Sequence, residues 1–239
     1  NKMDTKDFDV VAMRTDLHQI PELGFNEHKT SDYVAAKLKE MGLEPIRGIG
    51  GTGVVAYIDG TEPGPTVMLR ADMDALPFVI DGKDACIHAC GHDSHTAMVL
   101  ATAAKLIGHV KKGRVKLFFQ PAEETFEGAK DMLANGVLEG VDAALAYHVG
   151  PGRMPVGLFM YNSGKTMMYS VDGFRITIHG RGAHGAYPHS SIDPINIGVH
   201  VYLALESLIA READPGKACV LTIGNFSADS APNIIPDTA

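Results

Sequence analysis

The stretch Val-Lys-Leu-Phe-Phe-Gln-Pro-Ala-Glu-Glu at residues 115–124 decides how the first part of this chain folds. Its first half is a mostly apolar run of strand length, and Pro121 then breaks the run before two glutamates. We therefore expect a buried strand over residues 115–119 that ends in a loop carrying Glu123 and Glu124.

Two other segments repeat this arrangement of an apolar strand followed by polar side chains. Residues 67–71 lead into Asp72 and Asp74, and residues 143–147 lead into His148. In an open α/β sheet, ligands bind beyond the carboxyl ends of the strands. The sequence therefore predicts that these carboxylates and this imidazole meet at one edge of a sheet.

Apolar residues at helical spacing lie before and between these strands. The pattern predicts one helix over residues 28–41 and another from Gly91 to about residue 108. Strands and helices that alternate at these lengths indicate an α/β fold, with a mixed sheet flanked by helices on both faces.

The chain changes character after the first 165 residues. Residues 171–179 and 218–224 are expected to be strands, and Asp193-Pro194 is expected to open a helix over 194–211. We therefore expect a first domain over residues 1–165 and a smaller α+β domain over 166–239. This second domain lacks an evident closing element before Ala239, so it is expected to be incomplete.

Composition excludes several classes of protein. The chain has 239 residues, 45% of them apolar, and a net charge of -8, which argues against nucleic acid as a partner. No run approaches the roughly 18 apolar residues of a membrane span, and the charged N-terminus does not resemble a secretory signal. We expect a cytoplasmic protein without a membrane partner, and three cysteines are too few for a disulfide framework.

The stretch His-Ala-Cys-Gly-His-Asp-Ser-His at residues 88–95 gathers side chains that bind metal ions. Thiolate and imidazole groups suit zinc and its neighbours in the transition series, so Cys90 and His92 are candidate ligands of one cation. Asp93 is placed to orient an imidazole, as carboxylates around metal sites often do. A cysteine nucleophile with a histidine base is the competing use of Cys90.

The Glu123-Glu124 pair suits a division of labour at such a centre. One carboxylate can bind metal while the other accepts a proton from water that the cation has acidified. A solvated acidic loop is the plainer interpretation, but Pro121 and the two preceding phenylalanines favour a fixed loop. His148 alone is typical of a structural histidine. Whether Asp74 binds metal or supports a ligand stays open.

Several motifs in this chain together resemble one known family. That family comprises the dinuclear metal amidohydrolases of the hippurate hydrolase and indole-acetyl-amino-acid hydrolase group, which are relatives of aminoacylase and carboxypeptidase G. The matching stretches are Leu17–Gly24, Arg70–Pro77, His88–Asp93, Gln120–Glu124, Gly182–His184 with Pro188, and Asn233–Asp237.

The resemblance implies a role for each of these sites. Glu123 is implied as the general base, His184 as a group that polarises the scissile carbonyl, and Asn233 as a residue near the substrate. The fold implied is a catalytic domain interrupted by a smaller lid domain. The implied metal ligands are Cys90, His92, Glu124 and His148.

The resemblance also implies an activity, cofactors and partners. We expect metal-dependent hydrolysis of the amide bond of an N-acyl amino acid, with two divalent ions, zinc or manganese, as cofactors and a homodimer formed through the lid. A metallo-dipeptidase or carboxypeptidase is one alternative. Family members supply a last histidine ligand after the lid, and no residue follows Ala239 here. An inactive, truncated metal-binding fragment is therefore a second alternative.

Overall fold

The computed structural model describes residues 8–150, 152, 155–161, 164 and 168–239. The chain divides into two compact units, residues 1–158 and 159–239. The domain boundary expected between residues 165 and 166 lies outside the described residues.

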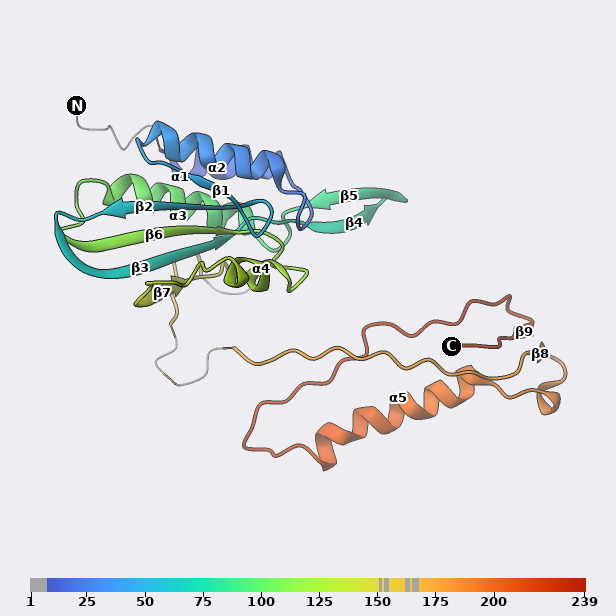
Figure 1. Cartoon of the computed structure of the whole chain (residues 1–239). Helices are drawn as coiled ribbons and strands as arrows, with labels where there is room; N and C mark the ends of the chain where they lie inside the picture. The colour runs from blue at the N-terminus through green and yellow to red at the C-terminus, as the bar shows by residue number, and fades with distance from the viewer. Residues whose placement is uncertain (1–7, 151, 153–154, 162–163, 165–167) are drawn as a thin grey trace. The chain divides into compact units, whose positions relative to one another are not determined.

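The first unit contains most of the regular structure (Figure 1). Its elements, in chain order, are α1 (Val10–His18), α2 (His28–Glu40), β1 (Ile46–Ile49), β2 (Gly53–Asp59), β3 (Glu62–Asp72), β4 (Leu76–Ile80), β5 (Lys83–Ile87), α3 (His92–Leu106), β6 (Lys112–Gln120), α4 (Gly128–Ala134) and β7 (Ala143–Ala146).

Five of these strands form one mixed sheet in the order β1-β2-β6-β3-β7. β3 runs parallel to both β6 and β7, while β2 runs antiparallel to β6. The register pairs Asp72 with Gln120, so β3 and β6 end at the same edge. The expected mixed sheet is confirmed.

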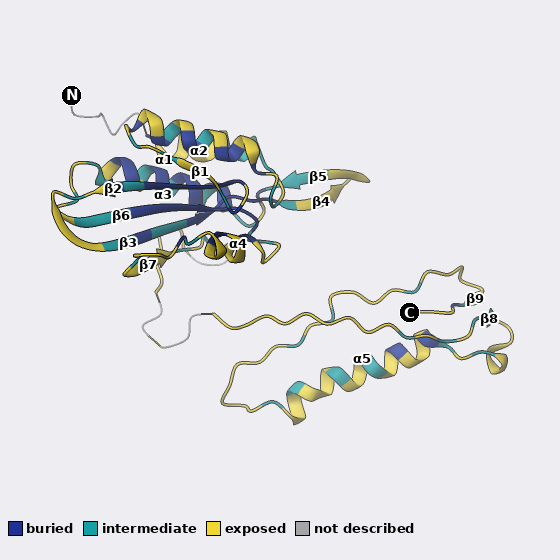
Figure 2. Ribbon diagram, viewed as in Figure 1, coloured by how far each residue is buried: buried dark blue, intermediate teal, exposed yellow. Residues whose placement is uncertain are grey.

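The sheet buries both of its faces, because successive side chains of a strand point to opposite sides. On β6, Leu117 and Phe119 join the core under α1, α2 and α3, whereas Phe118 packs with Met132 of α4. Dark blue strands between partly yellow helices show this layering in Figure 2. Helices therefore cover both faces, as the alternation of elements predicts.

A hairpin of β4 and β5 projects from the end of the sheet (Figure 1). Its two-residue turn, Asp81-Gly82, has positive φ at both positions, 51° and 72°. Such turns match the right-handed twist of paired strands, which is why Asp-Gly is favoured in them. One strand of the hairpin starts just after Asp74, and the other ends just before His88.

The second unit contains few paired strands. Its elements are β8 (Ala183–His184), the 3-10 helix η2 (Pro188–Ser190), α5 (Pro194–Arg211) and β9 (Ile234–Ile235). α5 confirms the predicted helix, and Asp193 caps it by accepting hydrogen bonds from two backbone N–H groups. Within the described residues, no helix has the length and apolar character needed to cross a membrane.

The strands predicted over residues 171–179 and 218–224 are wrong for this structure. Only the end of the first segment is paired, through hydrogen bonds between Ile178 and Ala239 and an isolated bridge at His179. A strand exists through its hydrogen bonds to a neighbour. Alternation of apolar and polar residues predicts which face would be buried, but it does not supply that neighbour.

Candidate metal centre and general base

Three parallel strands and one helix bring the candidate ligands together. β3, β6 and β7 end at the same edge, and the loops that follow them carry Asp74, Glu124 and His148. α3 begins at His92 after Gly91, whose φ is +86°. A Cβ on Gly91 would lie 2.5 Å from a methyl group of Val149, so glycine is required for this close approach.

The four predicted ligands lie within a few ångströms of one another. The Sγ atom of Cys90 lies 3.3 Å from Nε2 of His148, and Nε2 of His92 lies 3.7 Å from Oε1 of Glu124. Ligand atoms of Cys90, His92 and His148 form one cluster, and those of His92, Glu123 and Glu124 form another. His92 belongs to both clusters.

Two buried atoms of this group have no hydrogen-bond partner among the described residues. They are Nε2 of His92 and Oε1 of Glu124. Buried polar atoms are normally satisfied, so an unpaired nitrogen facing an unpaired carboxylate oxygen needs a ligand between them. A divalent cation accepts electron pairs from both, and the donor types present suit zinc or a neighbouring metal. The residues therefore fit a metal ion.

The electrostatics of Cys90 argue against its use as a nucleophile. Burial, a hydrogen bond to Glu124 and the charges of the nearby carboxylates raise the pKa of the Cys90 thiol to about 12. A nucleophilic cysteine needs a lowered pKa, because the thiolate is the reactive form. The alternative of Cys90 as a nucleophile is therefore not supported, whereas a bound cation would favour the thiolate directly.

Asp74 connects the helix ligand to the glutamate loop. Its Oδ1 atom lies 3.1 Å from Nδ1 of His92, and its Oδ2 atom accepts a 2.9 Å hydrogen bond from the backbone N–H of Glu124. The carboxylate is fully buried. A carboxylate on Nδ1 fixes the imidazole so that Nε2 carries the lone pair, which is the usual support for a metal-binding histidine.

His95 is held by partners on both sides of its ring. Nε2 accepts a 2.9 Å hydrogen bond from the backbone N–H of Val149, so Nδ1 carries the proton that it shares with Oδ1 of Asp72 at 2.5 Å. Burial alone would raise the pKa of Asp72, but the His95 bond and the Arg70 charge lower it to about 2. His95 is thus occupied in holding the segment that carries His148.

Asp93 lies on the far side of the same helix turn. Its Oδ2 atom lies 2.7 Å from Nδ1 of His18 and 3.1 Å from Nε of Arg14, both on α1. The imidazole that Asp93 orients is therefore that of His18, which is not one of the candidate metal ligands. His88 lies nearby with its ring 6.3 Å from that of His18, and neither of its nitrogens has a hydrogen-bond partner in the described part of the chain.

Glu123 is the carboxylate of the pair that stands further from the buried imidazole. Its Oε2 atom lies 4.0 Å from Nε2 of His92, and its side chain remains partly open to solvent. Burial first, and then the charge of Asp72, raise the pKa of Glu123 above its ordinary value. A carboxylate with a pKa closer to neutral pH is better suited to take and return a proton.

His184 and Asn233 lie side by side in the second unit. His184 pairs with Ile234 in the β8–β9 ladder, and the backbone N–H of Gly185 donates a 2.7 Å hydrogen bond to the carbonyl of Asn233. The ring of His184 packs 5.9 Å from that of Tyr187. These two residues are thus neighbours in space although 49 positions apart (233 minus 184).

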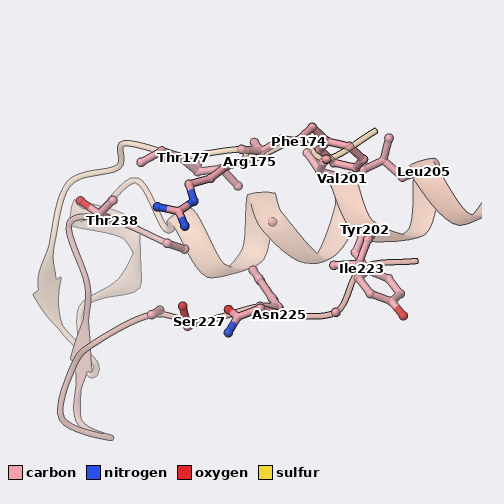
Figure 3. Close-up of a pocket in the computed structure, with 18 of the residues that line it drawn as sticks. Phe174, Arg175, Thr177, Val201, Tyr202, Leu205, Ile223, Asn225, Ser227 and Thr238 are labelled. Carbon is pink, nitrogen blue, oxygen red and sulfur yellow. The ribbon is translucent and has the colours of Figure 1, made fainter. Parts of the chain in front are cut away.

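The second unit also holds a cavity of about 980 Å³. Figure 3 shows it between α5 and the extended segments, with Tyr202 and Leu205 on the helix side and Ile223 and Asn225 opposite. None of the four candidate ligands lines this cavity. It is a gap within the packing of the second unit.

Reasoning from sequence missed the supports of the site. Glu27 is fully buried and accepts hydrogen bonds from two separate segments. Asp72 was expected near the site, but its bond to His95 was not. A buried carboxylate of this kind shows no local sequence pattern, so nothing in the sequence around Glu27 pointed to its role.

Two family models match this chain. The model described as "Peptidase family M20/M25/M40" matches residues 68–194, which include all four candidate ligands. The model described as "Peptidase dimerisation domain" matches residues 168–239.

Curated relatives match the chain over nearly its whole length. It is 40% identical over 253 residues to thermostable carboxypeptidase 2 of Saccharolobus solfataricus, covering 100% of this chain and 64% of the relative. It is 40% identical over 241 residues to an N-acyl-L-amino acid amidohydrolase of Geobacillus stearothermophilus, covering 95% of this chain and 64% of the relative.

A solved structure is similar to the chain in fold. The Bacillus subtilis YXEP protein, described as a dinuclear metal-binding peptidase of the M20 family, is 33% identical with a TM-score of 0.67, covering 98% of this chain and 62% of that one. The chain therefore spans between 62% and 64% of the length of these three proteins. With more than half of its residues matched by the family model, the chain belongs to peptidase family M20/M25/M40.

Proposed function

We propose that this chain carries the base and most of the metal centre of a hydrolase that cleaves the amide bond of N-acyl amino acids. One observation carries the proposal: Cys90, His92, Glu124 and His148 converge at the sheet edge while Glu123 stays at its rim. The products would be the free acid and the free amino acid.

The four converging side chains would hold two divalent cations, zinc or manganese. Thiolate and imidazole favour zinc, whereas the carboxylates also accept manganese. When bound, such cations lower the pKa of water and polarise a carbonyl oxygen. The number of two ions is supported by the similarity to the Bacillus subtilis YXEP protein, which is described as a dinuclear metal-binding peptidase.

Glu123 would move the proton in this reaction. It would take a proton from the attacking water and pass it to the amine that leaves. Its position supports this role, because its Oε2 atom lies 4.0 Å from Nε2 of His92 and its side chain is partly open to solvent. Asp74 would keep Nε2 of His92 directed at the metal, and His184 and Asn233 would contact the substrate.

The substrate class rests on the relatives and on the resemblance of the motifs. The Geobacillus stearothermophilus relative is named for N-acyl-L-amino acids. Hippurate-like and indole-acetyl-amino-acid-like conjugates are the members of this class that the motifs favour. Because a carboxypeptidase is equally similar, cleavage of a C-terminal residue from a peptide is the second candidate activity.

The proposed assembly is a homodimer formed through the second unit. Support comes from the dimerisation-domain match over residues 168–239 and from large apolar side chains that α5 leaves exposed, such as Leu203 and Leu208. Light scattering on the full-length protein tests this directly, with a mass of one subunit as the contrary result.

Substitution of Glu123 tests the reaction. In the full-length protein loaded with zinc or manganese, Glu123→Gln should lower turnover of an N-acyl amino acid by about 10²–10⁴-fold. Bound metal, measured by atomic emission, should stay at the wild-type level because the four ligands are unchanged. Turnover that survives in Glu123→Gln would remove Glu123 as the base.

Two controls complete the experiment. Glu127→Gln changes a carboxylate of the same loop that is paired with Lys130 at the surface, and it should leave turnover unchanged. A panel of N-acyl amino acids and peptides separates the two candidate activities. Preference for peptides with a free C-terminus would replace the amidohydrolase proposal by the carboxypeptidase one.

A further inference from the structure

The loop that carries Glu123 is held on both sides by buried carboxylates. The backbone N–H of Ala122, just before Glu123, donates a 2.7 Å hydrogen bond to Oε1 of Glu27. The backbone N–H of Glu124, just after it, donates a 2.9 Å hydrogen bond to Oδ2 of Asp74. The two amides that flank the proposed base are therefore each fixed by a separate side chain.

The buried side chain of Glu27 serves the loop contact and does not cap the helix that follows it. It precedes α2 but makes no side-chain cap there, because Glu22 accepts the hydrogen bonds from Lys29 and Thr30 instead. The second oxygen of Glu27 accepts a 2.6 Å hydrogen bond from the hydroxyl of Thr52. Among the described residues Glu27 has no cationic partner, and burying such a carboxylate is costly, so these bonds to neutral donors must compensate.

The conformation of the loop explains why it needs such a support. Ala122 has a φ of +49°, in the left-handed region that a residue with a Cβ rarely adopts. Gly24 lies so close that a Cβ there would be 3.1 Å from Cα of Ala122. Strained backbone of this kind persists only where surrounding contacts over-determine it.

We propose that Glu27 is a positioning residue for the reaction, which sets the orientation of Glu123 through the backbone of Ala122. The proposal rests on the proposed function, in which Glu123 is the general base. Asp74 differs from Glu27 because it also binds the imidazole of His92. Loss of Glu27 should therefore affect proton transfer and leave metal affinity intact, whereas loss of Asp74 should weaken both.

The test compares Glu27→Met with Glu27→Gln in the full-length protein. Methionine keeps the length of the side chain but accepts no hydrogen bond of comparable strength, whereas glutamine still accepts from Ala122 and donates to Thr52. With Glu27→Met, kcat should fall about 10–100-fold with KM within about threefold, because a misplaced catalytic group costs about that much. Zinc affinity should stay within about threefold, and Glu27→Gln should restore kcat to within about threefold of wild type.

Amide exchange gives a reading that does not depend on activity. Exchange at Ala122 should be at least about tenfold faster in Glu27→Met and unchanged in Glu27→Gln, because only the first loses the acceptor. If the wild-type protein cleaves no N-acyl amino acid, the proposed function fails, and this exchange measurement alone decides the positioning. Unchanged exchange at Ala122 in Glu27→Met overturns the proposal.

Glu22→Ala is the matched control for a merely structural role. It removes the cap of α2 from the same segment but leaves the Ala122 contact in place. Its kcat should stay near wild type, and an equal loss of kcat in Glu22→Ala and Glu27→Met overturns the proposal.

Should Glu27→Met not fold, Thr52→Val serves in its place. It removes the second bond to Glu27 and should lower kcat about 3–10-fold, and an unchanged kcat there counts against the proposal.

Discussion

The main helices of the two units differ in how many of their residues are buried. α3 in the first unit buries nine of its 15 residues, whereas α5 in the second buries two of its 18, Pro194 and Gly198. Yet α5 carries isoleucine, valine and leucine along most of its length. In Figure 2, α3 is largely blue and α5 largely yellow.

The difference shows that burial depends on partners more than on composition. α3 packs against α1, α2 and the strands β3 and β6, all within the same unit. α5 faces extended segments across a cavity of about 980 Å³ (Figure 3). An apolar sequence therefore indicates that a helix can be buried. Whether it is buried depends on the elements that pack against it.

The largest contrast is expected from matched leucine truncations. Leu100→Ala removes a fully buried side chain from α3 and should lower the free energy of unfolding of the first unit by about 3–5 kcal/mol. Leu203→Ala changes a side chain of α5 that is 61% exposed and, in a dissociated monomer, should cost less than about 0.5 kcal/mol. Urea denaturation measures both, and similar costs would show that α5 is covered in solution.

Metal binding should also change the stability of the two units to different extents. Zinc at about 100 times its Kd should stabilise the first unit by about 2.7 kcal/mol and leave the second unchanged, because all four candidate ligands belong to the first. Thermal unfolding with and without a chelator measures this. Cys90→Ser should abolish the effect and Cys86→Ser should not, since Cys86 lies on β5 outside the cluster. Zinc protection that persists in Cys90→Ser would refute the assignment.

Acid should weaken the first unit through Asp72. Its pKa of about 2 in the folded state lies below the value near 3.9 of an unfolded chain, so the ionised form stabilises the fold. This contribution, about 2 kcal/mol, is present above pH about 4 and is lost as the pH falls toward about 2. Urea unfolding of metal-free wild type and Asp72→Asn should therefore converge between pH about 5 and about 2.5. A constant gap would contradict this origin.

The smallest effects should come from the two aspartate caps. Asp9 and Asp193 each accept hydrogen bonds from two backbone N–H groups, at the start of α1 and α5 respectively. Each change to alanine should cost about 1 kcal/mol. Asp9→Ala should lower the unfolding midpoint of the first unit, whereas Asp193→Ala should speed amide exchange only in the first turn of α5. A lowered midpoint of the first unit in Asp193→Ala would show that the units unfold together.

Sequence patterns predicted the first unit well because local and tertiary preferences agree there. The run at residues 115–119 is apolar enough to lie in the centre of a sheet, and β6 occupies that place. Asp81-Gly82 is a strong hairpin signal between β-prone residues, yet the prediction omitted the β4–β5 pair. Over residues 171–179 the alternation of side chains was clear, but no described strand pairs along the length of that segment.

The site was predictable only in part. Cys90, His92, Glu124 and His148 follow strands or open a helix, so topology alone brings them together, and their role as ligands stays a prediction that awaits a metal-bound measurement. The contact of Glu27 with Ala122 spans 95 residues of sequence. No periodicity encodes such a bond, because it depends on where two loops happen to approach.

The β4–β5 hairpin has a consequence for how this protein could diversify. It is inserted between Asp74 and Cys90, so both of its ends are anchored at the proposed metal centre while its turn at Asp81-Gly82 stands free in solvent. Exposed turns accept insertions at little thermodynamic cost, since closure entropy grows slowly with loop length. The hairpin can thus be lengthened or exchanged, in evolution or by design, while the residues of the proposed centre at its two ends stay in place.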